Sequence, residues 1–241
     1  MGSLASWKRD HPTARDLKGI YRRLFSRFGR QHWWPGDGPF EVMIGAILTQ
    51  NTAWSNAAKA IHSLKQGRFL EPVALHTVAL KRLARLIRSS GYFNQKAERL
   101  KTFVRYFLDR YGGNVQGMRR VPWRILRKEL LTLKGIGPET ADSILLYALE
   151  KPVFVVDAYT RRVLARHSFI SWQASYEEIQ ELFMERLFAR TPYFSEYHAL
   201  FVAVGKEFCR TRPRCHACPL QTMGRLRLEP DIKPVRSSND T

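Results

Sequence analysis

Residues 131–143 read LTLKGIGPETADS, and this stretch indicates both a local fold and a kind of ligand. A segment with helical apolar spacing, 122–133, ends at the turn LKGIG, and small residues suited to a second helix follow directly. Gly135 and Gly137 allow positive φ angles and the close approach of another backbone. Ile136 between them can anchor the turn in a core. The sequence therefore predicts two helices joined by a glycine turn.

The second helix would present unpaired backbone N–H groups near Gly137 and Thr140, and such groups suit a phosphate. Glycine turns join many helix pairs, so the net charge of the chain adds a second indication. Lys and Arg number 40 against 21 Asp and Glu, a balance of +19. A surplus of this size predicts a polyanionic partner, either nucleic acid or an anionic membrane surface, although a merely soluble basic protein is the alternative.

The composition is that of a folded chain with a sizeable core. The 241 residues are 44% hydrophobic, which suits one large domain or two small ones. No apolar run reaches the ~18 residues that a membrane span needs, and the first residues carry no pattern of a secretion signal. Three cysteines near the C-terminal end make no disulfide framework, so we expect a reducing compartment.

Apolar residues recur at helical spacing almost throughout the chain, which predicts an all-α fold. Helices are expected over 77–88, 94–111 and 122–133, and Ser175 with Glu178 has the spacing of a capping box. The run 153–156 is the only one that resembles a strand, and it is too short to argue for a sheet. The tail 225–241 loses the apolar period and is expected to be mobile.

Eighteen residues after Glu139 comes Asp157, in VFVVDAYTRRVL. Taken alone, Asp157 is a favoured N-cap for a helix that begins at Ala158. LKGIGPETA followed by VVDAYTRRV resembles the signature of the helix–hairpin–helix DNA glycosylase superfamily. The resemblance implies that Asp157 is the catalytic carboxylate. One of its oxygens can cap the helix while the other faces the substrate.

The resemblance covers most of the chain. PFEVMIGAILTQNTAW is similar to the early buried helix and DNA-inserting loop of the endonuclease III branch, and VGKEFCRTRPRCHACPL to its iron–sulfur loop. HWWPGDGPFE and SGYFNQKAERL most resemble bacterial proteins of this branch that include the 3-methyladenine DNA glycosylase. The family fold implies a six-helix lobe with the hairpin over 31–150. Residues 1–30 plus 151–224 would form a second helical lobe with the cysteine-containing loop, and DNA would lie across the cleft.

Glu139 bears on the reaction, because family members that also cut the strand carry a lysine at this position. A lysine amine forms a Schiff base with the sugar, and a carboxylate cannot. The resemblance therefore implies a monofunctional glycosylase without lyase activity. Water would be the nucleophile, and Asp157 would stabilise the sugar cation and orient or deprotonate that water. Glu139 either adds a negative field near the cationic base and sugar or is an acid favoured by the helix dipole.

An alkylated purine such as 3-methyladenine is cationic, so its pocket should prefer a flat cation. Trp33, Trp34, Pro35 and Trp54 are the candidates for this pocket, since an indole face attracts such a ring. The alternative is that these indoles are core residues.

The stretch LTQNT is the candidate loop that enters DNA when the base leaves the stack. Asn51 falls where the family inserts a side chain, with Gln50 beside it. The alternative is ordinary capping within the loop.

Cys209, Cys215 and Cys218 are spaced C-x5-C-x2-C. The family pattern has a fourth cysteine six residues further on, where this chain has Gly224, and its first gap is one residue longer. A 4Fe–4S cluster with His216 or solvent as fourth ligand, a zinc ion held by three cysteines and a histidine, and a metal-free loop all stay open. In each case Arg210, Arg212 and Arg214 make a cationic loop suited to DNA phosphates.

These observations together predict a monofunctional DNA glycosylase of base-excision repair. Its expected substrate is duplex DNA with an alkylated purine of the 3-methyladenine type, and it is expected to act as a monomer in the bacterial cytoplasm. Within the family, the alternatives are a glycosylase for mismatched adenine or for oxidised bases. From another class, the alternative is a non-catalytic DNA-binding protein that kept the hairpin. Asp157 argues against that alternative and the incomplete cysteine set argues mildly for it.

Overall fold

The structure is a computed structural model that describes residues 12–224 and 226. The described residues are helical and contain no strand, which confirms the all-α prediction. The expectation for the tail 225–241 falls almost entirely outside the described residues. The chain divides into two compact units. Unit 1 comprises residues 1–31, 156–188 and 196–241, and unit 2 comprises residues 32–155 and 189–195.

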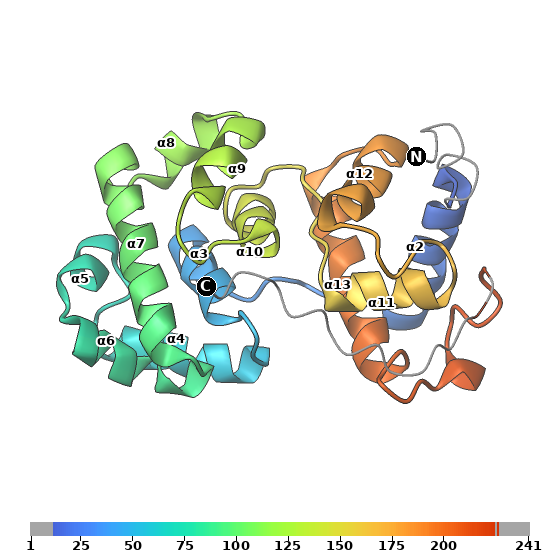
Figure 1. Cartoon of the computed structure of the whole chain (residues 1–241), viewed down its shortest axis with the longest axis horizontal. Helices are drawn as coiled ribbons and strands as arrows, with labels where there is room; N and C mark the ends of the chain where they lie inside the picture. The colour runs from blue at the N-terminus through green and yellow to red at the C-terminus, as the bar shows by residue number, and fades with distance from the viewer. Residues whose placement is uncertain (1–11, 225, 227–241) are drawn as a thin grey trace. The chain divides into compact units, whose positions relative to one another are not determined.

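Unit 2 contains the glycine hairpin within a set of short and long helices (Figure 1). In chain order these are α3 (Pro39–Leu48), α4 (Trp54–Gln66), α5 (Pro72–Thr77), α6 (Leu80–Leu86), the 3-10 turn η1 (Arg88–Ser90), α7 (Phe93–Tyr111), α8 (Val115–Arg120), α9 (Trp123–Leu131), α10 (Pro138–Ser143) and the π-helical segment η2 (Ile144–Ala148).

The core of unit 2 is built around α3. Pro39 opens this helix at its first turn, where the missing N–H costs nothing. Every residue from 42 to 48 is buried, and α3 packs against α4, α7, α10 and η2. Because α3 is apolar on all sides, it specifies a helix surrounded by other helices. The loop that begins after Leu48 therefore starts from a buried helix end.

The predicted helix 77–88 is wrong in its bounds. The chain forms α5, which ends at Thr77, and α6, which begins at Leu80, with Val78 extended between them. Lys101 donates hydrogen bonds from its Nζ to the carbonyls of His76 and Val78. A cation on the last carbonyls of α5 favours ending the helix there.

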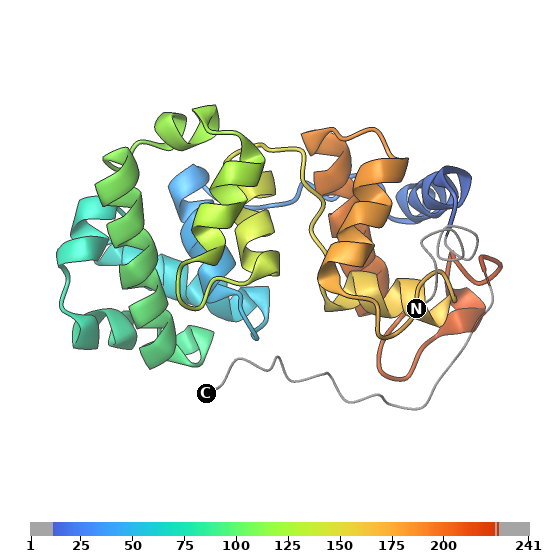
Figure 2. The same ribbon diagram turned by 45° about the horizontal axis from the view of Figure 1, so that its top comes forward.

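Unit 1 contains α2 (Ala14–Phe28), α11 (Ala158–Arg166), α12 (Tyr176–Arg186), the part of α13 (Thr191–Glu207) from Glu196 onward, and the 3-10 turn η3 (Cys215–Ala217). The predicted capping box at Ser175 and Glu178 opens α12, with both reciprocal hydrogen bonds present. Tyr197 stacks on Phe201 at 5.0 Å and donates its hydroxyl to the Leu17 carbonyl at 2.7 Å. This buried bond ties α13 to α2. In Figure 2, α2 is the blue helix near the N-terminal end of the described chain.

Candidate active site

The LKGIG segment forms the predicted turn between α9 and α10. Gly135 has a φ of +86°, and a Cβ at this position would lie 2.5–2.6 Å from the side chain of Arg99. Ile136 is 4% exposed and anchors the turn in the core of unit 2. Gly137 is extended and precedes Pro138, which opens α10. A left-handed backbone and the close packing of Arg99 together explain why the first glycine is needed.

A buried ion pair joins the two helices of this hairpin. Arg127 on α9 donates Nε and Nη2 to the two carboxylate oxygens of Asp142 on α10, at 2.8 and 3.1 Å. Asp142 is fully buried, and the Arg127 side chain is 16% exposed. A bidentate pair of this kind fixes geometry as well as adding energy. The hairpin is therefore held at its glycine turn and again one turn into α10.

The loop after α3 is attached to the hairpin by Gln50. The Gln50 amide donates to the Gly135 carbonyl at 2.9 Å and to the Thr140 hydroxyl at 2.8 Å. Arg99 donates Nη1 to the Gln50 carbonyl oxygen at 2.7 Å. Asn51 is exposed and has a φ of +52°. The two residues predicted to contact DNA therefore differ in their surroundings. The Gln50 side chain is hydrogen-bonded within unit 2, while Asn51 is exposed in the loop.

Lys96 supports the same loop and was not predicted. Its side chain is 1% exposed, and Nζ donates to the carbonyls of Leu48 at 2.9 Å and Ser90 at 2.6 Å. Burial, with a smaller contribution from Arg99, lowers the pKa of Lys96 from 10.5 to about 8. The sequence does contain a signal that could have identified Lys96, because it is a lysine on the apolar face of the predicted helix 94–111. Lys96 holds the C-terminal end of α3, from which the loop begins.

Three aromatic rings meet where the cationic-base pocket was predicted. Trp34 lies edge-on to Trp54, with ring centroids 5.2 Å apart, and 5.2 Å from Tyr147. A Cβ added at Gly45 would lie 3.5 Å from the Trp34 indole, an ordinary van der Waals distance, so this ring packs against α3 at Gly45. The Trp34 Nε1 is buried and has no hydrogen-bond partner among the described residues. The structure thus brings Trp34 and Trp54 together, each half-buried, and adds Tyr147.

Tyr147 lies in the π-helical segment η2, a geometry that often accompanies functional sites. No sequence signal marked it. Trp33 lies edge-on to Trp34 at 6.1 Å, and Pro35 is exposed. Glu139 is exposed in the first turn of α10, a place that is compatible with both roles predicted for it.

In unit 1, Asp157 is the N-cap of α11, as the sequence predicts. Its Oδ1 accepts a hydrogen bond from the Thr160 backbone N–H at 2.7 Å. Its Oδ2 lies 3.5 Å from Nε2 of His198 on α13, and the Asp157 side chain is 11% exposed. Burial raises the pKa of the Asp157 carboxyl, but His198 and the Thr160 hydrogen bonds lower it by more, so the pKa lies below its usual range. Asp157 is held as a carboxylate in a nearly dry setting.

His198 was not predicted. It lies on α13, far from Asp157 in the sequence, and it belongs to none of the motifs that the sequence analysis identified. Its side chain is 7% exposed. Because it faces the carboxylate oxygen that does not cap α11, it is placed to influence the charge and orientation of Asp157.

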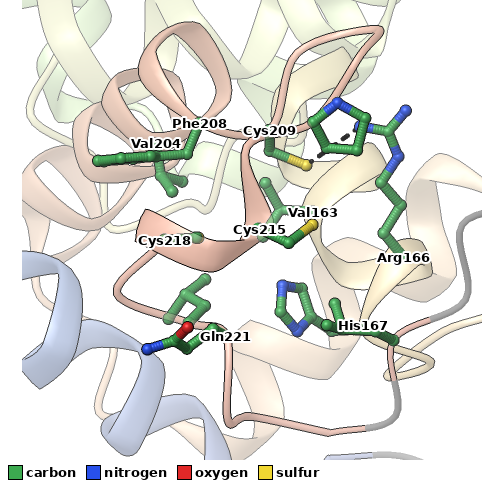
Figure 3. Close-up of a pocket in the computed structure, with 12 residues that line it drawn as sticks. Val163, Arg166, His167, Val204, Phe208, Cys209, Cys215, Cys218 and Gln221 are labelled. Atoms are coloured by element: carbon green, nitrogen blue, oxygen red, sulfur yellow. Dashed lines mark hydrogen bonds between the residues drawn. The ribbon is translucent and has the colours of Figure 1, made fainter.

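The three cysteines line one small cavity in unit 1, together with Arg166 and His167 (Figure 3). The cavity volume is about 10 Å³, which is about the room one water needs. His216, the predicted fourth ligand, is exposed on η3. In the part of the chain that the structure describes, no three His, Cys, Asp or Glu side chains are grouped to hold a metal ion. The residues present therefore do not fit a 4Fe–4S cluster or a zinc ion in this arrangement.

The arginines of the same loop, Arg210, Arg212 and Arg214, are exposed. Arg210 donates Nε to the Lys206 carbonyl at 2.6 Å, which orients its side chain at the end of α13. Their predicted contact with DNA phosphates stays a prediction.

Comparison with known proteins identifies the class to which this arrangement belongs. Residues 44–188 match the family described as "HhH-GPD superfamily base excision DNA repair protein". The chain is 45% identical over 204 residues to MJ1434, a candidate DNA repair glycosylase of Methanocaldococcus jannaschii, covering 84% of this chain and 92% of that protein. It is 30% identical over 206 residues to endonuclease III of Thermotoga maritima, covering 85% and 90%.

Two solved structures show the same fold. The H. pylori 3-methyladenine DNA glycosylase MagIII, bound to 1,N6-ethenoadenine, has a TM-score of 0.69 at 27% identity and covers 80% of this chain and 97% of its own. An endonuclease III–DNA complex has a TM-score of 0.76 at 25% identity and covers 89% and 96%.

The chain belongs to the HhH-GPD superfamily and has the fold of endonuclease III. It is a DNA glycosylase of base-excision repair. Among the described residues, no helix is both long and apolar enough to cross a membrane.

Proposed function

We propose that this protein is a monofunctional DNA glycosylase that hydrolyses the N-glycosidic bond of an alkylated purine of the 3-methyladenine type in duplex DNA. The observation that carries the base assignment is the cluster of Trp34, Trp54 and Tyr147. Indole and phenol faces attract a flat cation, and alkylated purines are the damaged bases that carry such a charge. Similarity to MagIII, solved with an ethenoadenine base, supports the same class of substrate.

In this proposal Asp157 is the catalytic carboxylate. Its low pKa keeps it ionised at neutral pH, so that it can stabilise the positive charge that develops on the sugar. The Thr160 N–H holds one oxygen in place, so that the carboxylate does not have to reorganise during the reaction. Water is the nucleophile, and Asp157 orients it or removes its proton. A cationic leaving base needs no general acid, and the proposal assigns none.

Glu139 accounts for the absence of strand cleavage in this proposal. An acid cannot form the imine by which a lysine at this position would open the sugar. Its exposed carboxylate at the start of α10 is favoured by the helix dipole and adds a negative field that suits a cationic base.

The DNA contacts are proposed to come from three places. The hairpin residues Gly135, Ile136, Gly137 and Thr140 hold a backbone phosphate. Asn51, at the exposed tip of its loop, fills the space left by the flipped base, while Gln50 fixes that loop to the hairpin. The exposed arginines after α13 contact further phosphates. We propose that the protein acts as a monomer in the cytoplasm.

A panel of duplexes tests the base assignment. Purified protein is incubated with matched duplexes that each carry one lesion: 3-methyladenine, 1,N6-ethenoadenine, 8-oxoguanine, or adenine in a mismatch. We expect single-turnover release to be fastest for 3-methyladenine, because it is the cationic base of the four. Faster release of 8-oxoguanine or mismatched adenine would assign the enzyme to one of those substrate classes instead. Binding without release of any base would leave only a DNA-binding protein.

A further inference from the structure

The loop that carries the cysteines is joined to α11 by arginine side chains. We use the name cysteine loop for residues 208–224. Arg162 donates Nε to the Cys209 carbonyl at 2.7 Å and Nη2 to the Gly205 carbonyl at 3.1 Å. Arg166 donates Nη1 to the Arg210 carbonyl and Nη2 to the Thr211 carbonyl, the latter at 3.2 Å. The start of the loop is therefore clamped to α11 through three backbone carbonyls, and the Gly205 carbonyl joins α11 to the end of α13.

Arg166 also contacts one of the three cysteines. It is 7% exposed, and its Nη1 lies 3.5 Å from Cys209 Sγ (Figure 3). An arginine that is nearly fully buried is uncommon unless its donors are used. Here both terminal nitrogens are directed at the loop, while Nε is buried without a hydrogen-bond partner among the described residues. The remaining cavity of about 10 Å³ leaves room for about one water.

The end of the loop is closed by backbone packing. His167, the residue after α11, bonds through Nδ1 to the Met223 carbonyl at 2.7 Å. Gly224 follows with a φ of +62°, and a Cβ added there would lie 2.3 Å from the His167 carbonyl oxygen. A contact this short with a backbone atom cannot be relieved by turning a side chain. Position 224, where the family pattern has its fourth cysteine, therefore accepts glycine and excludes cysteine.

We propose that the arginines of α11, and not a metal, hold the cysteine loop, and that the loop folds without an iron–sulfur cluster or zinc. Cys209 and Cys218, 7% and 6% exposed, then act as small apolar core residues. The loop still presents its exposed arginines, and it does so independently of iron supply. This inference does not depend on which base the enzyme removes.

Metal content gives the first test. Full-length protein purified without oxygen should hold iron and zinc far below one equivalent and show no visible absorption band of a cluster. Dialysis against a strong chelator should leave its melting temperature unchanged. Stoichiometric zinc, or iron with the visible band, would overturn the proposal.

A matched pair of substitutions at residue 224 tests the excluded ligand position. Gly224→Cys restores the four-cysteine pattern of the family, and Gly224→Ala adds the same Cβ without a thiol. We expect both variants to melt at lower temperature by similar amounts. We also expect Gly224→Cys to gain no cluster on reconstitution with ferrous iron and sulfide. A reconstituted cluster in Gly224→Cys with the melting temperature of the parent would contradict the proposal.

Limited trypsin digestion tests the clamp itself, because the loop contains exposed arginines. Arg166→Met should be cleaved in the loop several-fold faster than the parent, since it loses three hydrogen bonds to the loop. Cys215→Ser and the exposed-site control Arg22→Met should be cleaved at the parent's rate. Faster loop cleavage in Cys215→Ser, with Arg166→Met unchanged, would show that the cysteines hold the loop. If Arg166→Met does not fold, the metal content of the parent and the comparison of Gly224→Cys with Gly224→Ala still test the proposal.

Discussion

At the scale of single residues, Asp157 combines a structural and a proposed chemical role in one carboxylate. One oxygen caps α11 through the Thr160 N–H, and the other faces His198 at 3.5 Å. The same neighbours that fix the side chain also lower its pKa. A fixed, ionised carboxylate in a nearly dry setting is what electrostatic stabilisation of a sugar cation requires.

Asp157→Asn should separate these roles. The amide keeps the shape and an oxygen that can cap the helix, but it removes the charge. We expect single-turnover base release to fall by ~100-fold or more, the scale of a lost electrostatic catalyst. Binding to undamaged duplex, measured by fluorescence anisotropy, should be retained. Equal release rates for variant and parent would refute the catalytic role.

Trp54 is the second residue whose role can be separated by experiment. If its indole holds a cationic base, Trp54→Ala should slow excision of 3-methyladenine more than it weakens binding to an abasic site. The difference should be about 1–2 kcal/mol, the scale of a desolvated cation–π contact. Parallel losses in the two assays would mean instead that Trp54 serves only the packing of Trp34.

At the scale of elements, the hairpin is fixed from three sides. Arg99 packs over Gly135, Gln50 bonds to the turn, and the Arg127–Asp142 pair joins α9 to α10. The loop that carries Asn51 is attached to the same hairpin through Gln50. Within unit 2, the hairpin turn proposed to bind a phosphate and the loop proposed to enter DNA are therefore joined by hydrogen bonds.

The energetic cost of the buried charges in the Arg127–Asp142 pair can be tested by comparing the removal of one charge with the removal of both. Asp142→Asn removes the carboxylate charge of the buried Arg127–Asp142 pair and should lower the free energy of unfolding by about 3–5 kcal/mol. The double variant Arg127→Met/Asp142→Leu removes both charges and should recover much of this loss. Urea denaturation followed by circular dichroism measures both. A double variant as destabilised as Asp142→Asn, or more so, would speak against a buried-charge cost.

Features of these elements could be predicted where neighbouring residues determine them, and could not where they depend on tertiary contacts. The glycine turn, the Asp157 cap and the capping box of α12 are written in neighbouring residues, and all three are present. Tyr147, His198 and Arg166 reach their partners only through tertiary packing, so no local pattern marked them. The break between α5 and α6 was missed for the same reason, because Lys101 comes to it from α7.

At the scale of the whole molecule, the charge of +19 should govern binding to undamaged DNA. Each phosphate contact releases counterions, so affinity should fall steeply and linearly in a log–log plot against salt. Replacing Arg210, Arg212 and Arg214 together by Gln should make that slope less steep. The exposed Arg85, Arg105 and Arg120 of unit 2 provide a control triple of equal charge. A flat salt dependence in the parent would contradict electrostatic binding.

The reaction assigned to the whole enzyme is hydrolysis of the base without cleavage of the strand. An end-labelled duplex treated with a methylating agent measures both in one reaction, with free base quantified by chromatography and strand length by gel. We predict release of 3-methyladenine, strands that stay full length until alkali or heat is applied, and no protein–DNA adduct after borohydride. A borohydride-trapped adduct with the unmutated protein, persisting after contaminating lyases are excluded, would contradict the account.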